Sequence, residues 1–206
     1  MPLLLFGYGS LLYDPERPDA LVDRFVARLD GWSRRFNKPS RPRGILRRHA
    51  DWHGPLPELP DEAFTLDEAY LSLALGTTPG GWIDGEVLVY RDDATADVMA
   101  RMNRREGVVP GRPPERDHYR CVEVEVQAGS RQVWATTWMS NPGGDWHVAG
   151  LTIAQEAAIL RRATPRVPRA HAKGARYLFG VEDGLRERGV YDAYVSELAE
   201  AVRRIP

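Results

Sequence analysis

The first segment that could bind a charged group is a glycine-containing turn near the N-terminus, Gly7-Tyr8-Gly9-Ser10-Leu11-Leu12. It directly follows the apolar run Leu3–Phe6, as is typical of a strand that leads into a tight turn. Two glycines spaced two apart allow positive φ values, so consecutive N–H groups can point into one concavity. Such a concavity binds an anion or an oxyanion that develops during a reaction. A tight turn without a function is the alternative interpretation.

The same turn does not fit the nucleotide-binding motifs that also use glycines. A dinucleotide-binding fingerprint needs a third small residue and a helix that opens at the turn. Here the third position is Leu12, and Pro15 and Pro18 interrupt the residues that follow. A phosphate-binding P-loop is excluded because no Gly-Lys-Ser/Thr sequence follows the turn.

The second candidate is Glu106, the last residue of a helix predicted to start near Ala94. Spacings of three and four place it on the same side as Val98 and Met102, which are expected to face the core. Gly107 comes next and is typical of a helix C-terminus. The negative end of the helix dipole and partial burial are both expected to raise the pKa of this carboxyl. A carboxyl of this kind suits acid/base chemistry near neutral pH, whereas the alternative is a surface glutamate paired with one of the preceding arginines.

Alternating apolar residues and turn residues predict the strands that must position these two groups. Strands are predicted over Leu3–Phe6, Phe25–Trp32, Ala69–Leu75, Gly81–Tyr90, His118–Val126 and Gln132–Met139. Pro79-Gly80 predicts a turn between two of them, and Ala128-Gly129-Ser130 predicts a hairpin between the last two. Residues 38–67 are rich in proline, arginine and acidic residues without a clear period, so a long loop or lid is predicted there.

The last part of the chain, about residues 152–203, is predicted to be helical. Thr152 and Gln155 form a capping-box pattern before an apolar run. Two further helices are predicted over Lys173–Glu187 and Asp192–Arg203. Strands first and helices last favour a single α+β domain over residues 1–206, with a small closed sheet and helices outside it.

Several landmarks occur in order along nearly the whole chain. They are Leu5–Leu12, Leu29–Phe36, Gly85–Tyr90, Asn103–Gly107, Tyr177–Phe179 and Gly189–Val195. Together they resemble the γ-glutamylcyclotransferase family, specifically its ChaC-like, glutathione-degrading branch. Three segments depart from the family pattern, namely Asn37–Gly44, His49–Asp67 and, in part, Asn141–His147. These segments are expected to frame the leaving group of the substrate.

The resemblance implies a small mixed β-barrel flanked by helices, with no metal and no cofactor. It implies that the turn Gly7–Leu12 binds the γ-glutamyl group, mostly through backbone N–H groups, and that Glu106 is the catalytic acid/base. The implied reaction releases 5-oxoproline from a γ-glutamyl peptide, with glutathione, which would yield Cys-Gly, as the expected substrate. A cyclotransferase for other γ-glutamyl amines or amino acids, and a γ-glutamyl-binding module without activity, are the alternatives.

Other residues whose side chains could take part in binding or catalysis are considered as well. Tyr119, at the start of a strand, is a candidate substrate contact, and a core or rim tyrosine is the alternative. His49 and His53 are four apart, but the prolines that follow argue against the helix that would make them a metal pair, so no metal site is predicted. Trp134 and Trp138 are predicted to share one face of a strand and to lie in the core.

Composition limits the class of protein. The 206 residues carry 28 Lys+Arg against 29 Asp+Glu, a net charge of −1, so no global field attracts nucleic acid or an anionic membrane. The arginines of Arg34–Arg48 predict a solvated basic loop or a contact to an anionic ligand. The single cysteine, Cys121, is predicted to be buried, and one thiol without a disulfide partner favours the reducing cytoplasm. The apolar start, Met1–Phe6, is too short for a signal peptide or a membrane span. The expected partner is therefore a small molecule, and the oligomeric state is left open.

Overall fold

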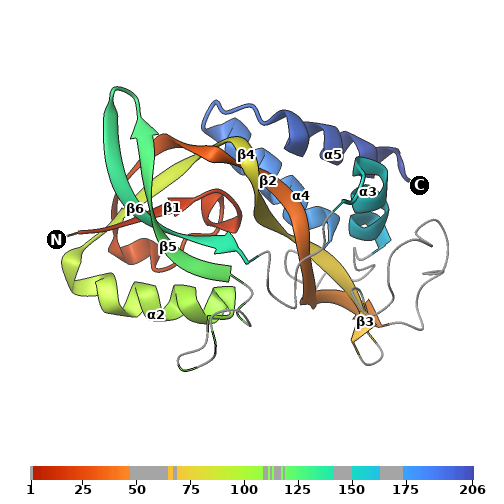
Figure 1. Cartoon of the computed structure of the whole chain (residues 1–206), viewed down its shortest axis with the longest axis horizontal. Helices are drawn as coiled ribbons and strands as arrows, with labels where there is room; N and C mark the ends of the chain where they lie inside the picture. The colour runs from red at the N-terminus through yellow and green to blue at the C-terminus, as the bar shows by residue number, and fades with distance from the viewer. Residues whose placement is uncertain are drawn as a thin grey trace.

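The computed structural model, shown in Figure 1, describes residues 2–46, 65–66, 69–108, 111, 113, 117, 119–141, 150–162 and 174–206. Its strands are β1 (Leu3–Gly7), β2 (Leu21–Leu46), β3 (Thr65–Leu66), β4 (Ala69–Tyr90), β5 (Tyr119–Ala128) and β6 (Arg131–Ser140). They follow the order β1-β6-β5-β2-β4-β3, and β4 also pairs with β1, which closes a barrel. The barrel is mixed because β1 and β6 are parallel, whereas the other pairs are antiparallel. The expected small mixed barrel is confirmed.

The two longest strands, β2 and β4, pair along most of their length, from Leu21 opposite Tyr90 to Leu46 opposite Ala69. The loop predicted over residues 38–67 is therefore wrong at both ends, since residues 38–46 continue β2 and residues 65–66 form β3. Residues 47–64 and 67–68 lie outside the described residues. The extension escaped prediction because backbone pairing with β4 supports this strand without an alternating apolar pattern.

The turn predicted at Pro79-Gly80 is also wrong. Pro79 lies inside β4 opposite Trp32, and the register shifts between Asp30 and Trp32. Gly80 and Gly81 have φ values of 99° and 78°, which only glycine adopts readily. An irregularity of this kind accommodates both proline and positive-φ glycine within a strand. Residues that usually reverse a chain therefore bend one long strand here.

The helices of the described residues are α2 (Thr95–Glu106), α3 (Ile153–Arg162), α4 (Ala175–Glu187) and α5 (Ala193–Arg204), and a 3-10 turn precedes α2. The predicted capping box is present, because Thr152 N donates to Gln155 Oε1 (2.8 Å) and Gln155 N donates to Thr152 Oγ1 (3.3 Å). Asp192 caps α5 by accepting from Val195 N at 3.0 Å. None of the helices in these parts of the chain is long and apolar enough to cross a membrane.

Buried apolar side chains form two clusters. The larger fills the barrel and continues under α3, α4 and α5. The smaller lies between the barrel wall and α2, and it includes Leu5, Leu88, Val98 and Met102. Figure 1 shows the corresponding arrangement, with α2 on one side of the barrel and the three later helices together on another. The C-terminal end of α2 is thus held against the barrel by its apolar face.

Two predictions about β5 and β6 are wrong. Trp138 is buried and donates from Nε1 to Asn103 Oδ1 of α2 at 3.1 Å, but Trp134 is 64% exposed. The β5–β6 hairpin extends past the barrel away from α2 (Figure 1), and Trp134 lies in the part of β6 near the hairpin turn, opposite the exposed Glu125. Cys121, predicted to be buried, is exposed, because it lies on the outer surface of β5 where the side chains alternate between exposed and half-buried.

Candidate active site

The predicted turn lies where β1 ends, and it continues as a short 3-10 helix, Ser10–Leu12. Its glycines are explained by close packing and not by positive φ, since φ of Gly9 is −129°. A Cβ at Gly7 would lie 2.8 Å from Leu11 Cβ, and a Cβ at Gly9 would lie 3.1 Å from the Tyr177 hydroxyl oxygen. The prediction of positive φ is thus wrong, and what favours glycine here is the close approach of Leu11 to Gly7 and of Tyr177 to Gly9.

The turn contains consecutive N–H groups that its own hydrogen bonds do not use. Leu12 N and Tyr13 N donate to the carbonyls of Gly9 and Ser10, at 3.0 and 3.2 Å. Over the ranges that the structure describes, the N–H groups of Gly9, Ser10 and Leu11 have no acceptor. Adjacent backbone N–H groups without an acceptor can bind a negatively charged oxygen.

Side chains of the turn are directed into the protein. Tyr8, Leu11 and Leu12 are buried, and Tyr8 donates its hydroxyl hydrogen to the carbonyl of Trp138 at 2.5 Å. Ser10 is half-buried, and its Oγ accepts a hydrogen bond from α2. Because these side chains fix the turn from the inside, its backbone is the part that remains to contact a ligand.

Glu106 is the last residue of α2, and the chain leaves the helix at Gly107 in the left-handed conformation, with φ of 74°. Its side chain is 19% exposed, on the helix face that buries Val98 and Met102. The predicted helix face and helix end are therefore confirmed. The Glu106 carboxylate is close enough to Tyr8 to add to the effect of burial, and both raise the pKa of the Tyr8 hydroxyl. The structure thus brings Glu106 and the N-terminal turn together.

Arg105 joins the end of α2 to the same turn. Its Nη2 donates to Ser10 Oγ at 2.9 Å, and its Nη1 donates to the Asp14 carbonyl at 3.0 Å and to Glu16 Oε1 at 2.9 Å. The separation from Arg105 Nε to Glu106 Oε1 is longer, at 3.9 Å. Arg105 is therefore directed mainly to the segment after the turn, and it holds the helix end in place beside it.

Lys38 lies near Glu106 but was not predicted as a site residue, because the segment that contains it was predicted to be a loop. It lies in β2, it is only 2% exposed, and its Nζ is 4.4 Å from the centre of the Tyr119 ring. Burial lowers its pKa from 10.5 to about 7, and the nearby Glu106 carboxylate opposes this change. The only sequence feature that could have pointed to Lys38 is its position, two residues after the landmark Leu29–Phe36.

Tyr119 lies beside Lys38, and its hydroxyl donates to the carbonyl of Leu75 at 2.5 Å. It is 8% exposed, and its ring faces the Lys38 ammonium. A buried polar group continues from here, in which Thr77 N donates to Ser140 Oγ (2.8 Å) and Asn37 Nδ2 donates to the Thr77 carbonyl (3.0 Å). Polar residues of β2, β4 and β6 thus form one buried hydrogen-bonded group.

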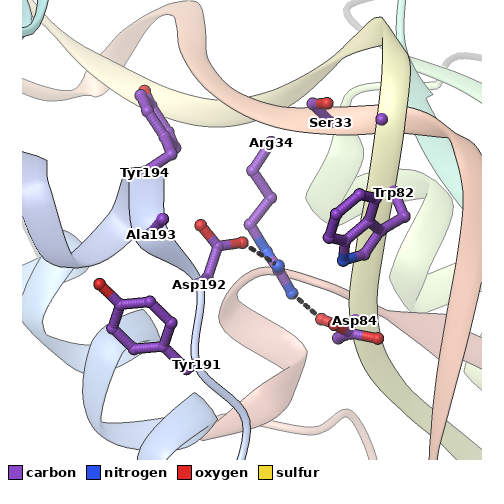
Figure 2. A pocket seen from close by; sticks show the side chains of 9 residues that line it. Ser33, Arg34, Trp82, Asp84, Tyr191, Asp192, Ala193 and Tyr194 are labelled. Carbon is purple, nitrogen blue, oxygen red and sulfur yellow. Dashed lines mark hydrogen bonds and ion pairs between the residues drawn. The ribbon is translucent and has the colours of Figure 1, made fainter.

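Arg34 contacts the turn at the Tyr8 carbonyl, and the prediction that it belongs to a solvated basic loop is wrong. It is 2% exposed, since β2 carries it into the barrel wall beside α5. Figure 2 shows its guanidinium between Asp192 and Asp84. All three residues line a cavity of about 290 Å³. Trp82, Tyr191 and Tyr194 are among the residues that line this cavity, and Glu106 is not among them.

The described residues contain no group of three or more histidine, cysteine or acidic side chains that could hold a metal ion. His49 and His53, the pair weighed as metal ligands, lie outside the described residues.

No protein-family model matches the chain, and no curated protein matches it in sequence. Solved structures do match. A yeast γ-glutamyl cyclotransferase specific to glutathione superposes with a TM-score of 0.71 at 17% identity, covering 98% of this chain and 96% of the yeast chain. A second crystal structure described in the same way gives 0.68 at 16% identity, with 99% of both chains covered. A further γ-glutamyl cyclotransferase gives 0.50 at 16% identity, with 96% of this chain and 86% of the other covered. The chain therefore has the fold of γ-glutamyl cyclotransferases.

Proposed function

We propose that this chain is a γ-glutamyl cyclotransferase that releases 5-oxoproline from a γ-glutamyl peptide, with glutathione as the substrate to test first. The observation that carries the proposal is the position of Glu106, a partly buried carboxylate beside a turn with three adjacent backbone N–H groups. The shared fold supports it, since the matched yeast protein is described as specific to glutathione. Small molecules are the expected partners.

In the reaction, the α-amine of the γ-glutamyl group attacks the carbon of its own γ-amide. The bond to the next residue breaks, a five-membered lactam forms, and glutathione yields 5-oxoproline and Cys-Gly. One proton leaves the attacking amine and one reaches the leaving amine, so no water or cofactor is consumed. Both reacting groups belong to one molecule, and binding in a folded conformation therefore supplies much of the rate.

Glu106 is the group proposed to take the proton from the attacking amine and to return one to the leaving amine. The N–H groups of Gly9, Ser10 and Leu11 are proposed to hold the γ-glutamyl group and the oxygen on which negative charge develops. Donors fixed in this way stabilise the charge without reorganising during the reaction. Tyr8, Leu11 and Leu12 contribute by anchoring the turn, and Tyr119 contributes by holding the Lys38 side of the cluster.

The test is release of 5-oxoproline from glutathione, measured by chromatography for the wild type and for Glu106→Gln. Loss of one acid/base group lowers a rate by about 10²–10⁴-fold, so a fall of this size is expected with an unchanged circular dichroism spectrum. Glu125→Gln, at an exposed position on β5, is the matched control and should keep full activity. Full turnover by Glu106→Gln would contradict the assignment of the acid/base.

The same assay separates the alternatives. A panel of γ-glutamyl dipeptides and γ-glutamyl amines decides whether the leaving group is Cys-Gly, an amino acid or an amine. A binding module without activity predicts γ-glutamyl binding by calorimetry, but no 5-oxoproline from any compound.

We place the reaction in the cytoplasm, because the single cysteine suits a reducing compartment.

A further inference from the structure

Arg34 makes a set of contacts that connects the N-terminal turn to the C-terminal helices. Its Nε donates to the carbonyl of Tyr8 at 2.8 Å, and its Nη1 contacts Asp192 Oδ2 at 2.5 Å. Its Nη2 donates to the backbone carbonyl of Asp84 on β4. Each of the three guanidinium nitrogens thus has a partner, and two of the partners are backbone carbonyls.

The bond to Tyr8 has a geometric consequence for the next residue. The described chain contains no cis peptide bond, so the carbonyl of Tyr8 and the N–H of Gly9 point in opposite directions across one planar peptide group. By holding the carbonyl, Arg34 directs the Gly9 N–H to the opposite side of the turn. The N–H of Gly9 is one of the three donors of the turn that lack an acceptor among the described residues.

The charge of Arg34 also acts on this peptide group. A hydrogen bond from a charged donor is stronger than a neutral one, and it polarises the peptide that accepts it. Polarisation increases the positive charge on the Gly9 hydrogen and makes this N–H a better donor. The ion pair with Asp192, the N-cap of α5, keeps the guanidinium in the required orientation.

We propose that Arg34 is a positioning residue for the cyclotransferase reaction, which orients and polarises the Tyr8–Gly9 peptide so that the Gly9 N–H stabilises the developing oxyanion. Asp192 supports it from the C-terminal part of the chain. The inference rests on the proposed function. It assigns a catalytic task to a side chain that does not touch the substrate.

The cavity beside Arg34 allows a direct test. Removing the Arg34 side chain opens space that joins a cavity of about 290 Å³, which is lined by exposed aromatic residues, Trp82 and Tyr191 (Figure 2). A free guanidinium ion is small enough to enter by this route and to take the place of the missing head group. Chemical rescue is therefore expected for this position.

The experiment measures 5-oxoproline release from glutathione by wild type, Arg34→Ala, Arg34→Lys and Arg28→Ala, each with and without millimolar guanidinium. Removing one oxyanion donor lowers kcat by about 10²–10³-fold, so Arg34→Ala should lose about 10²-fold in kcat with little change in KM. Guanidinium should raise the kcat of Arg34→Ala about 10-fold. The kcat of Arg34→Lys should lie between those of wild type and Arg34→Ala, since one ammonium cannot reach all three acceptors. Arg28 also pairs with Asp84 but does not contact the turn, so Arg28→Ala should behave as wild type.

The outcomes separate the two claims. If wild type releases no 5-oxoproline from any γ-glutamyl compound, the proposed function fails. If wild type is active and Arg34→Lys retains full kcat, the positioning role is rejected. A lower kcat in Arg34→Ala with no response to guanidinium, in a variant whose thermal unfolding is cooperative, also rejects it, because a merely structural loss is not reversed by a small ion.

Discussion

Replacing Lys38 by methionine is expected to change how the free energy of unfolding depends on pH. In the native protein, burial lowers the pKa of Lys38 from 10.5 to about 7. An unfolded chain holds this proton up to its ordinary pKa, so it binds more protons than the native state between the two values. Stability therefore rises with pH in this window, by about 1.4 kcal/mol per pH unit. Below pH 7 the buried charge lowers the free energy of unfolding by its full amount, about 5 kcal/mol, and above the ordinary pKa of lysine it no longer lowers it.

Methionine keeps the length and volume of the side chain and removes the ammonium. Lys38→Met should be more stable than wild type by several kcal/mol at about pH 6, and the advantage should vanish near pH 10. Urea unfolding followed by tryptophan fluorescence at a series of pH values measures the difference between the two proteins. Because the difference is taken at each pH, other titrating groups cancel.

Glu106 supplies the control for this prediction. Its carboxylate favours the charged form of Lys38, so Glu106→Gln should lower the pKa of Lys38 further and extend the window to lower pH. A difference between Lys38→Met and wild type that does not vary with pH would refute the reasoning, since it would show that native Lys38 titrates as in the unfolded chain.

Two further predictions concern buried groups outside the candidate site. Glu156 is 2% exposed, and burial raises its pKa from 4.5 to about 7 against the hydrogen bond that Tyr194 donates. Its pKa is higher in the native than in the unfolded state, so the stability of wild type falls as pH rises from 4.5 through 7. The free energy of unfolding of Glu156→Gln, measured with urea, should therefore exceed that of wild type by about 3 kcal/mol at about pH 8 and equal it at about pH 4. In the same assay at one pH, Trp138→Ala should lose about 3–5 kcal/mol, whereas Trp134→Ala, at an exposed position, should stay within about 0.5 kcal/mol; similar losses for both would contradict the burial found here.

Several features of the candidate site could be predicted from sequence, because they depend on local interactions. The apolar run before Gly7 marks a strand, and the residues at three and four positions before Glu106 mark its helix face. Gly107 marks the point where the helix ends. Each signal lies within one turn of helix or a few residues of strand, so it depends little on contacts with residues distant in the sequence.

Other features could not be predicted in this way. Lys38 and Arg34 occur in a segment whose composition is typical of a polar loop, yet both are 2% exposed. Their burial depends on partners distant in sequence, among them the Tyr119 ring and the Asp192 carboxylate. The positive φ values predicted for the glycines of the turn are wrong, and the tight contact at Gly9 comes from Tyr177, which is far along the chain.

The sequence by itself determined the turn after β1, the face and end of α2, the β5–β6 hairpin and the capped helices of the C-terminal part. Only the tertiary structure decided that Pro79 lies within one long strand, that Trp134 is exposed, and that Arg34 and Lys38 are buried. Local signals arise from neighbours in the chain, whereas burial and charge pairing arise where the closed barrel brings distant strands together.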